Sequence, residues 1–271
     1  MKNKISRFFK PLIYTFERAR MPWNPGLEIM SDEDTINDIV VKHKSLARFG
    51  EGEFKWIFMD DEAPAFQRNS LELSERLTKA FSNMNKNLLV CIPANMFNHE
   101  NQTLDSKMAW VKFVNKYWVQ IRRLVNLDYR YGNAGVMSPC KGYMDQWQAG
   151  DRFKNLKRIW DEKNVLVVEG ETSKIGVEND LLHNAKNVDR IEYPEKNAFA
   201  KIDDIYKDIM RKMKVHKYDI VLLTLGPTAS ILVSELTNAG IQAVDVGELD
   251  AEFERYAHAR EEIIERMENE K

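Results

Sequence analysis

The chain has 271 residues, of which 44% are hydrophobic and 30% are charged, which indicates a folded protein with a sizeable core. Its formal net charge of −2 excludes a strong global attraction to nucleic acid, so no nucleic-acid partner is expected. No stretch reaches the roughly 20 uninterrupted apolar residues of a membrane span. Because Cys91 and Cys140 stand in unrelated contexts, we also expect no disulfide framework, and a reducing cytoplasm as the compartment.

Residues 1–30 are predicted to form an amphipathic, basic N-terminal segment. The first twenty residues carry six Lys or Arg side chains against one Glu, and apolar residues recur there at helical spacing. Pro11 argues against an unbroken helix. One interpretation is peripheral docking to the inner face of the membrane or to a partner protein. The other, which we favour, is packing of the segment against the protein's own core.

From Ser31 onward the chain alternates helical and strand signals, which predicts a single α/β domain over residues 31–271. Short apolar runs bounded by Gly or Pro indicate six strands: SLARFG, NLLVCIP, NVLVVEGE, VDRIEYP, YDIVLLTLG and IQAVDVGE. Apolar residues at helical spacing indicate helices after Ser31, over 71–81, over 104–125, up to Trp160, from about Lys201 and over 251–267. The segment YGNAGVMSPCKGYMD is predicted to be irregular.

Strands that alternate with helices indicate a Rossmann-like, mostly parallel sheet with helices on both faces. In such sheets ligands bind beyond the carboxyl ends of the strands. The residues that follow each strand are therefore the first candidates for a binding site.

One strand ends in the small-residue turn Gly226-Pro227-Thr228-Ala229-Ser230, where a helix begins at once. Pro227 suits the first helical position, and the free N–H groups and dipole of a helix start favour an anion. A bound phosphate is one interpretation of this turn. Ordinary helix initiation is the other.

Carboxylates follow three further strands, as Glu51 and Glu53, as Glu169 and Glu171, and as Glu248, Asp250 and Glu252. Paired carboxylates repel a diphosphate unless a divalent cation lies between them, and Mg²⁺ and Mn²⁺ prefer oxygen ligands of this kind. These carboxylates could equally have purely structural roles. Asp250 would cap the last helix, and Glu51 would be a solvated residue in a first helical turn.

The segment SKIGVENDLLHNAKN follows the Glu-Gly-Glu turn. Gly176 permits a close approach of the backbone, and Asn179 and Asp180 suit hydrogen bonding to a base or a ribose. Both side chains could equally cap the helix that carries Leu181 and Leu182.

Four motifs together resemble the GT-D-type glycosyltransferases, which glycosylate bacterial surface adhesins and related cell-surface glycans. They are RFGEGEF, VEGETSKIGVENDLLHNAKNVDRIEYPEKNAFAKID, LLTLGPTASILVSEL and QAVDVGELDAEFE, in the family's order. The resemblance covers about Ser45 to Tyr256 and is most specific over residues 165–254.

The resemblance implies a Rossmann-like fold, a UDP-sugar donor and a divalent metal, Mn²⁺ or Mg²⁺. The family's acid-x-acid metal motif falls on Glu51 and Glu53, although the family more usually has Asp first. Two further positions depart from the family, which usually has His where this chain has Glu248 and Trp where it has Arg255. The implied reaction moves a hexose, of the glucose or galactose class, to a glycan or glycoprotein acceptor.

Roles for single residues follow from the resemblance and from position. Glu51 and Glu53 are expected to hold the metal, and Glu248 or Asp250 to activate the acceptor hydroxyl as the catalytic residue. The UDP-sugar is expected to contact residues at four strand ends: Arg48, Gly50, Glu171, Ser173, Gly176, Asn179, Asp180, Gly226, Pro227 and Thr228.

A different class of function is also consistent with the sequence. The departures at Glu51 and Glu248, with the amphipathic N-terminus, would suit a non-catalytic nucleotide-binding module that partners other glycosyltransferases in a glycosylation complex. A kinase is disfavoured because the chain has no phosphate-binding Gly-x-x-x-x-Gly-Lys-Ser/Thr loop.

Overall fold

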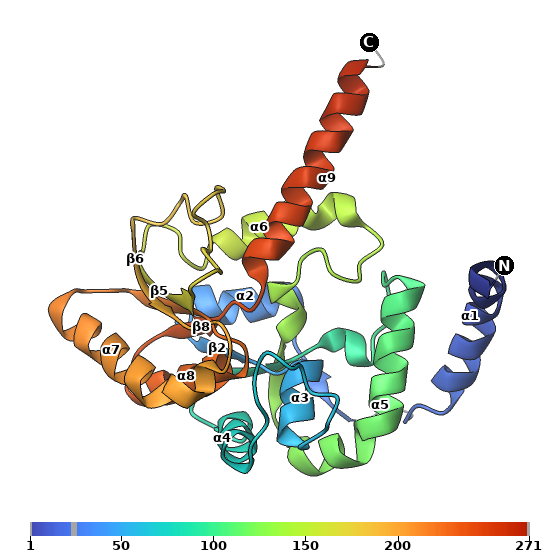
Figure 1. Ribbon diagram of the computed structural model, residues 1–271, viewed down its shortest axis with the longest axis horizontal. Coiled ribbons are helices and arrows are strands. Elements are labelled where there is room, and N and C mark those ends of the chain that lie inside the picture. The colour runs from blue at the N-terminus through green and yellow to red at the C-terminus, as the bar shows by residue number, and fades with distance from the viewer. Residues whose placement is uncertain (1, 23–25, 270–271) are drawn as a thin grey trace.

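A computed structural model describes residues 2–22 and 26–269, and its centre is one parallel sheet (Figure 1). The described part of the chain forms an eight-stranded sheet in the order β1-β4-β3-β2-β8-β7-β5-β6, and each pair of adjacent strands is parallel. The strands are β1 (Glu28–Ile29), β2 (Ser45–Arg48), β3 (Leu88–Ile92), β4 (Arg130–Asn133), β5 (Asn164–Gly170), β6 (Asn187–Tyr193), β7 (Ile220–Thr224) and β8 (Ala243–Asp245).

Helices connect the strands and cover both faces of the sheet. They are α1 (Lys2–Ala19), α2 (Asp32–Val40), α3 (Glu51–Ile57), α4 (Leu71–Phe81), α5 (Leu104–Leu124), α6 (Ala149–Lys157), α7 (Ile202–Val215), α8 (Pro227–Asn238) and α9 (Leu249–Asn269). Four short 3₁₀ turns complete the described elements: η1 (Ala94–Met96), η2 (Ala134–Met137), η3 (Gln146–Gln148) and η4 (Ala198–Lys201).

The period-two alternation of strand side chains divides the core into two clusters. In β3, Val90 packs with α3, α4, α5, α7 and α8, whereas Leu89 and Cys91 pack with α2, α6 and α9 on the other face. Both faces are buried, which is why the strands read as continuous apolar runs. The prediction of a Rossmann-like parallel α/β fold is confirmed.

The sequence missed two strands, β1 and β4. β1 has only two residues, and β4 lies inside the segment that was predicted to be irregular. β4 contains Gly132, at which a Cβ would lie 2.4 Å from the sulfur of Cys91 on β3, so that only glycine fits between these strands. Since Glu28 and Ile29 pair with β4, the end of the basic segment 1–30 joins the sheet.

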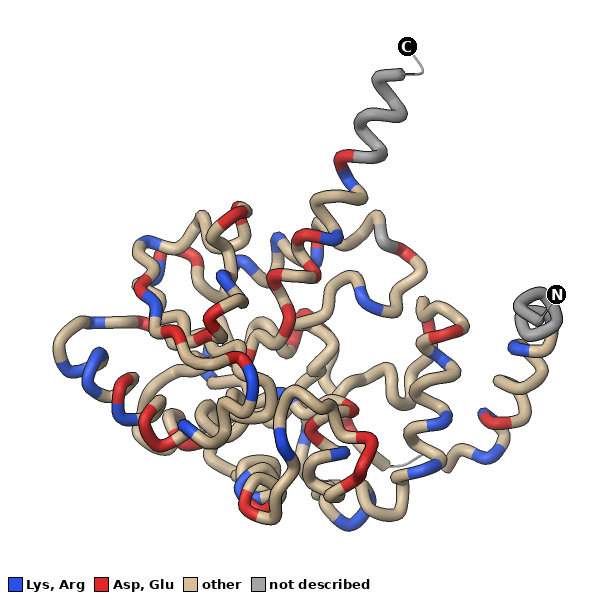
Figure 2. Tube along the Cα trace, in the orientation of Figure 1, with Lys and Arg blue, Asp and Glu red and all other residues tan. Residues whose placement is uncertain are grey.

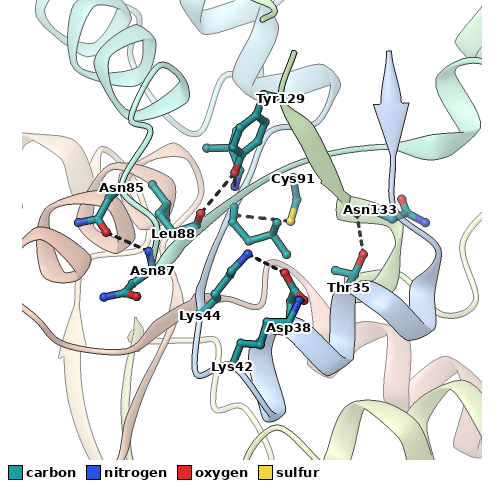
Figure 3. Close-up of polar contacts among 12 residues, drawn as sticks. Thr35, Asp38, Lys42, Lys44, Asn85, Asn87, Leu88, Cys91, Tyr129 and Asn133 are labelled. Carbon is teal, nitrogen blue, oxygen red and sulfur yellow. Dashed lines mark hydrogen bonds and ion pairs between the residues drawn. The ribbon is translucent and has the colours of Figure 1, made fainter. Parts of the chain in front are cut away.

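Polar contacts hold α2 against the sheet beside β3 and β4 (Figure 3). Asp38 on α2 is buried and pairs with Lys42 and Lys44 at 2.6 and 2.7 Å. Thr35 Oγ1 accepts a hydrogen bond of 3.0 Å from the backbone N–H of Asn133, at the end of β4. The Asp38 pairs therefore hold the turn between α2 and β2, and the Thr35 contact ties α2 to the carboxyl end of β4.

The N-terminal helix lies at the edge of the molecule, beside α5 and away from the sheet (Figure 1). It runs through Pro11 without a break, which the sequence did not predict. One face of α1 contacts α5, but Leu12, Ile13 and Phe16 are 67%, 44% and 65% exposed. Our preferred interpretation, in which this apolar stripe packs against the protein's own core, is therefore wrong for these three residues. Within residues 2–22 and 26–269, no helix is long and apolar enough to cross a membrane.

Candidate active site

A large cleft of about 1110 Å³ opens at the carboxyl edge of the sheet. Its lining residues lie at or beyond the carboxyl ends of β2, β8, β7 and β5 and also follow β3 and β4. The chain leaves β2 toward β3 on one side and enters β8 from β7 on the other, so connections diverge between β2 and β8. Such a switch point is where parallel α/β sheets bind their ligands.

Arg48, the last residue of β2, supplies a cation to the floor of this cleft. Its guanidinium fits only because Gly247 has no side chain, since a Cβ there would lie 2.5 Å from Nη2. Gly247 also has φ +55°, a backbone conformation that favours glycine. Arg48 Nε is buried without a hydrogen-bond partner, and its nearest carboxylate oxygen, Asp245 Oδ1, is 3.9 Å away.

Asp245 holds the floor of the cleft beneath Arg48. It is 1% exposed and accepts hydrogen bonds from the Gly247 N–H at 3.0 Å and from Ser230 Oγ at 2.8 Å. Burial raises the pKa of the Asp245 carboxyl to about 6, while Arg48 acts to lower it. Burial acts to lower the pKa of the Arg48 guanidinium, but Asp245, Glu53 and Glu248 outweigh it and the pKa is raised. The cation therefore stays charged.

The two predicted metal ligands lie in the first turn of α3, and both line the cleft. Glu53 is 5% exposed, and its Oε2 accepts a hydrogen bond of 2.8 Å from the Gly50 N–H, which caps the helix. The Glu51 side chain is 46% exposed and pairs with Lys55 at 2.7 Å. Gly50 also lines the cleft, as predicted for a ligand-binding residue.

The oxygen donors suit a divalent cation that is shared with a ligand. Among the residues that the structure describes, no group of three or more His, Cys, Asp or Glu side chains is placed to hold a metal alone. Mg²⁺ and Mn²⁺ commonly need only one or two carboxylates when phosphate oxygens and water complete the shell. Glu51 has a single cationic partner, and Glu53 keeps Oε1 beyond its cap bond, so the pair fits that pattern.

Of the predicted turn Gly226–Ser230, only Gly226 lines the cleft, next to Leu225, which precedes it. Gly226 has φ +54°, and a Cβ there would lie 2.6 Å from the ring of Phe66, which also lines the cleft. Pro227 and Thr228 are buried and do not line the cleft, and the Thr228 hydroxyl has no hydrogen-bond partner. We expected free N–H groups for an anion at this helix start. The N–H of Ala229 instead donates a hydrogen bond of 3.0 Å to Gly226 O.

The loop after β5 contributes less than predicted. Ser173 lines the cleft, but Glu171 is exposed outside it. Asp180 contacts Lys157 on α6 and lines a separate cavity. The Gly176 N–H and Asn179 Nδ2 both donate to Asp250 Oδ1, at 2.8 and 2.9 Å. These two residues therefore anchor the start of α9 and do not line the cleft.

The two predicted catalytic carboxylates, Glu248 and Asp250, line the cleft where α9 begins. Asp250 Oδ1 already accepts two hydrogen bonds, whereas Glu248 is exposed and its carboxylate faces the field of Arg48. Glu248 is accordingly the more accessible of the two carboxylates.

The opposite wall of the cleft was identified from the sequence only within the irregular region 126–150, where acceptor contacts were expected. It consists of η1, the start of α5, η2 and the loop after η2, and its lining residues are mostly neutral, polar or aromatic: Asn95, Thr103, Asp105, Ser106, Ala109, Trp110, Ala134, Gly135, Ser138, Lys141 and Gly142. Asn95 Oδ1 is buried there without a hydrogen-bond partner. Residues of α5 were predicted only as an aromatic-rich helix, so periodicity gave no sign of this role.

Glu252 holds the loop of this wall in place. It is 1% exposed, and its Oε2 accepts the backbone N–H groups of Cys140 and Lys141, both at 2.9 Å. Arg255, which replaces the family's usual tryptophan, pairs with the other oxygen of Glu252. This departure from the family thus has a structural role in the protein.

Comparisons with known proteins show the family of this fold. The family model described as the glycosyltransferase GT-D fold matches residues 46–270. The chain is 29% identical over 234 residues to "Probable glycosyl transferase Gly" of Streptococcus gordonii, with 86% of this chain and 33% of that protein covered. It is 30% identical over 239 residues to "Glycosyltransferase GlyD" of Streptococcus pneumoniae serotype 4, with 84% and 27% covered. The chain thus spans a third or less of these relatives.

Solved structures share nearly the whole fold. A structure of the domain of unknown function 1792, described as a distinct glycosyltransferase fold, has a TM-score of 0.82 at 30% identity, with 90% of this chain and 86% of that one covered. A glycosyltransferase from Streptococcus sanguinis with the same domain has a TM-score of 0.80 at 28% identity, with 86% and 85% covered. The chain belongs to the glycosyltransferase GT-D fold family.

Proposed function

We propose that this protein is a metal-dependent glycosyltransferase that takes a hexose, of the glucose or galactose class, from a UDP-sugar. The observation that carries the proposal is Arg48, a buried guanidinium at the β2–β8 switch point whose Nε has no hydrogen-bond partner. Gly247 makes room for it, and three carboxylates keep it charged. A cation held in this way is suited to the pyrophosphate of a nucleotide sugar.

The side of the cleft that carries Arg48, Glu51, Glu53 and Glu248, here called the charged wall, also offers contacts for the base of the donor and for a metal ion. The ring of Phe66, which packs edge-on against Trp56 with centroids 5.3 Å apart, gives an apolar surface for a flat base. Glu51 and Glu53 would hold Mn²⁺ or Mg²⁺, which when bound supplies positive charge for the leaving diphosphate. Arg48 stabilises the same developing charge as UDP departs, and Glu248 accepts the proton of the acceptor hydroxyl.

The neutral wall is suited to the acceptor, a glycan or glycoprotein. Sugars bind through hydroxyl hydrogen bonds and through stacking of their apolar faces on aromatic rings. Ser106 and the unpartnered Asn95 Oδ1 offer hydrogen bonds, and Trp110 offers a ring. The wall meets the charged wall in one cleft, as a transfer between two bound substrates requires.

The test is release of UDP from UDP-glucose and UDP-galactose, with Mn²⁺, with Mg²⁺ and after chelation. Glu53→Gln keeps an oxygen for the Gly50 N–H and removes only the charge, so it is expected to abolish metal-dependent release while the protein stays folded. Glu75→Gln, on the exposed face of α4, is the control and is expected to retain release. Full activity of Glu53→Gln would remove Glu53 from the metal assignment.

A non-catalytic nucleotide-binding module, acting with other glycosyltransferases, is the second candidate. It is favoured by the replacement of the family's usual residues at Glu51 and Glu248, which lie in the cleft. Thermal unfolding with UDP and Mn²⁺ separates the two functions. Stabilisation by UDP without turnover of any donor would support the module and contradict the enzyme.

A further inference from the structure

An apolar stripe on α1 faces solvent although another face of the helix is held by contacts of Lys10, Tyr14 and Glu17. Leu12, Ile13 and Phe16 are 67%, 44% and 65% exposed, and Phe9 in the same stripe is 51% exposed. These positions are three or four residues apart, which places them on one face of a helix. Four large apolar side chains so arranged exceed the scattered exposure of an ordinary soluble surface.

The stripe does not hold α1 to the protein, because a different set of contacts does. Lys10 pairs with Asp105 at 2.6 Å, and the Tyr14 hydroxyl lies 2.8 Å from His99 Nδ1. Asn115 on α5 donates to the backbone oxygen of Glu17 at 2.9 Å. These residues lie on the face of α1 that meets α5, so Leu12, Ile13 and Phe16 on the other face stay exposed to solvent.

The charges of the segment decide what that partner is. The first twenty residues carry six cations and one acid. The acid, Glu17, accepts a hydrogen bond from Asn115 and pairs with Arg20 at 3.4 Å, and its side chain is only 21% exposed. Arg18 and Arg20 follow it, and Arg20 lies over the ring of Phe16 at the margin of the stripe. Figure 2 shows Lys and Arg positions on both sides of the acidic position of α1.

We infer that α1 docks the protein on an anionic lipid bilayer, with the stripe inserted at the level of the headgroups and the cations beside it. An amphipathic helix of this length with basic flanks lies in the plane of the interface and gains both apolar burial and electrostatic attraction. Because α1 packs on α5, which lines the cleft, docking would hold the cleft near the membrane surface. This inference stands apart from the choice of donor sugar.

Co-sedimentation of the full chain with vesicles tests the inference. We compare vesicles of phosphatidylcholine alone with vesicles that contain about one third phosphatidylglycerol. Binding to the anionic vesicles is expected to be at least about tenfold stronger, because each Lys or Arg near such a surface contributes on the order of 1 kcal/mol. It is also expected to weaken as salt rises.

Two variants with the same added charge separate the stripe from the helix as a whole. Leu12→Glu lies in the stripe and is expected to weaken binding about tenfold or more, since it puts a charge into the apolar face. Thr15 is exposed on another side of α1, and Thr15→Glu is expected to change binding by no more than about fivefold, the effect of one added charge. Leu12→Phe keeps the apolar character and is expected to bind like the original protein.

Circular dichroism and UDP binding, measured without lipid, show that the variants remain folded. Absence of binding to anionic vesicles, equal binding to both vesicle types, or equal binding of Leu12→Glu and Thr15→Glu would each overturn the inference. Sedimentation velocity covers the remaining occupant of the stripe. A dimer that Leu12→Glu dissociates would show that a second copy covers it, and would also overturn the membrane assignment.

Discussion

Replacement of Gly247 by alanine tests the position of the cation in the cleft. The new Cβ would lie 2.5 Å from Arg48 Nη2, 2.7 Å from Cζ and 3.0 Å from Nε. Ordinary van der Waals contact begins at 3.4 Å, so the guanidinium must move by about 0.9 Å or the chain must shift. Gly247→Ala therefore displaces Arg48 without changing any charge in the cleft.

The expected effect on nucleotide binding follows from the contacts that Arg48 would make. Hydrogen bonds between a charged donor and a charged acceptor contribute about 1.5–3 kcal/mol. Their loss weakens UDP binding by about 10- to 150-fold. Isothermal titration calorimetry with UDP and Mn²⁺ measures this change directly.

A matched control separates the loss of Arg48 from backbone strain. Gly240 also has a positive φ, +82°, but a Cβ there meets nothing within 4 Å. Both alanine variants are expected to lose about 1–2 kcal/mol of unfolding free energy from the left-handed backbone. Only Gly247→Ala is expected to lose UDP affinity. Equal UDP affinity in the two variants would refute the placement of the diphosphate at Arg48.

Three further predictions concern the floor and the neutral wall of the cleft. The pKa of Asp245 is raised from 3.8 to about 6, so the original protein loses unfolding free energy as pH rises through that range. Asp245→Asn lacks this loss, so its unfolding free energy, measured by urea denaturation, should rise relative to that of the original protein by about 3 kcal/mol between pH 3 and pH 7. A difference that stays constant with pH would contradict this. Glu252→Ala should lower the unfolding free energy by about 2–3 kcal/mol, because the backbone N–H groups of Cys140 and Lys141 lose their acceptor. Glu252→Gln keeps an acceptor oxygen and should lower the unfolding free energy by less. Equal losses in the two variants would contradict this role of Glu252. Trp110→Ala should raise the KM for a glycan acceptor about 2- to 10-fold, at the energy of a lost ring contact, and leave release of UDP to water unchanged; an equal fall in the rates of glycan transfer and of UDP release to water would speak against an acceptor role.

The sheet was largely predictable because both of its faces are buried. All six strands that were predicted from apolar runs are strands in the structure, and the helix over 71–81 has the predicted bounds. β4 was missed because its sequence, RYGN, has neither an apolar run nor alternation. Its place is set instead by the tight fit of Gly132 against β3, a contact between distant residues that local patterns do not encode.

The candidate site was predictable only in part, for a similar reason. Residues at the ends of β2 and β8 line the cleft as predicted, where Arg48, Gly50, Glu51 and Glu53 meet Glu248 and Asp250, whereas Glu171 after β5 lies outside it. Most of the predicted residues further along that loop do not line the cleft either, because the fold turns their side chains toward other partners. Asn179 binds Asp250 instead of facing the cleft.

The N-terminal helix shows the limit of amphipathicity as a signal. Helical spacing of apolar residues predicts that one face is buried, but it does not say against what. In the structure the buried face of α1 is the one with Tyr14 and Glu17, while the more apolar face with Leu12 and Phe16 is exposed. Contacts with α5, and not hydrophobicity alone, decide which face packs.

The central claim is that a nucleotide diphosphate binds at the switch point between β2 and β8. A crystal structure of the protein with UDP and Mn²⁺ tests it most directly. We expect phosphate oxygens within hydrogen-bonding distance of the Arg48 guanidinium, and the metal on Glu51 or Glu53. UDP bound in the cavity between α6 and α9, or in the cleft with its phosphates away from Arg48, would contradict the account.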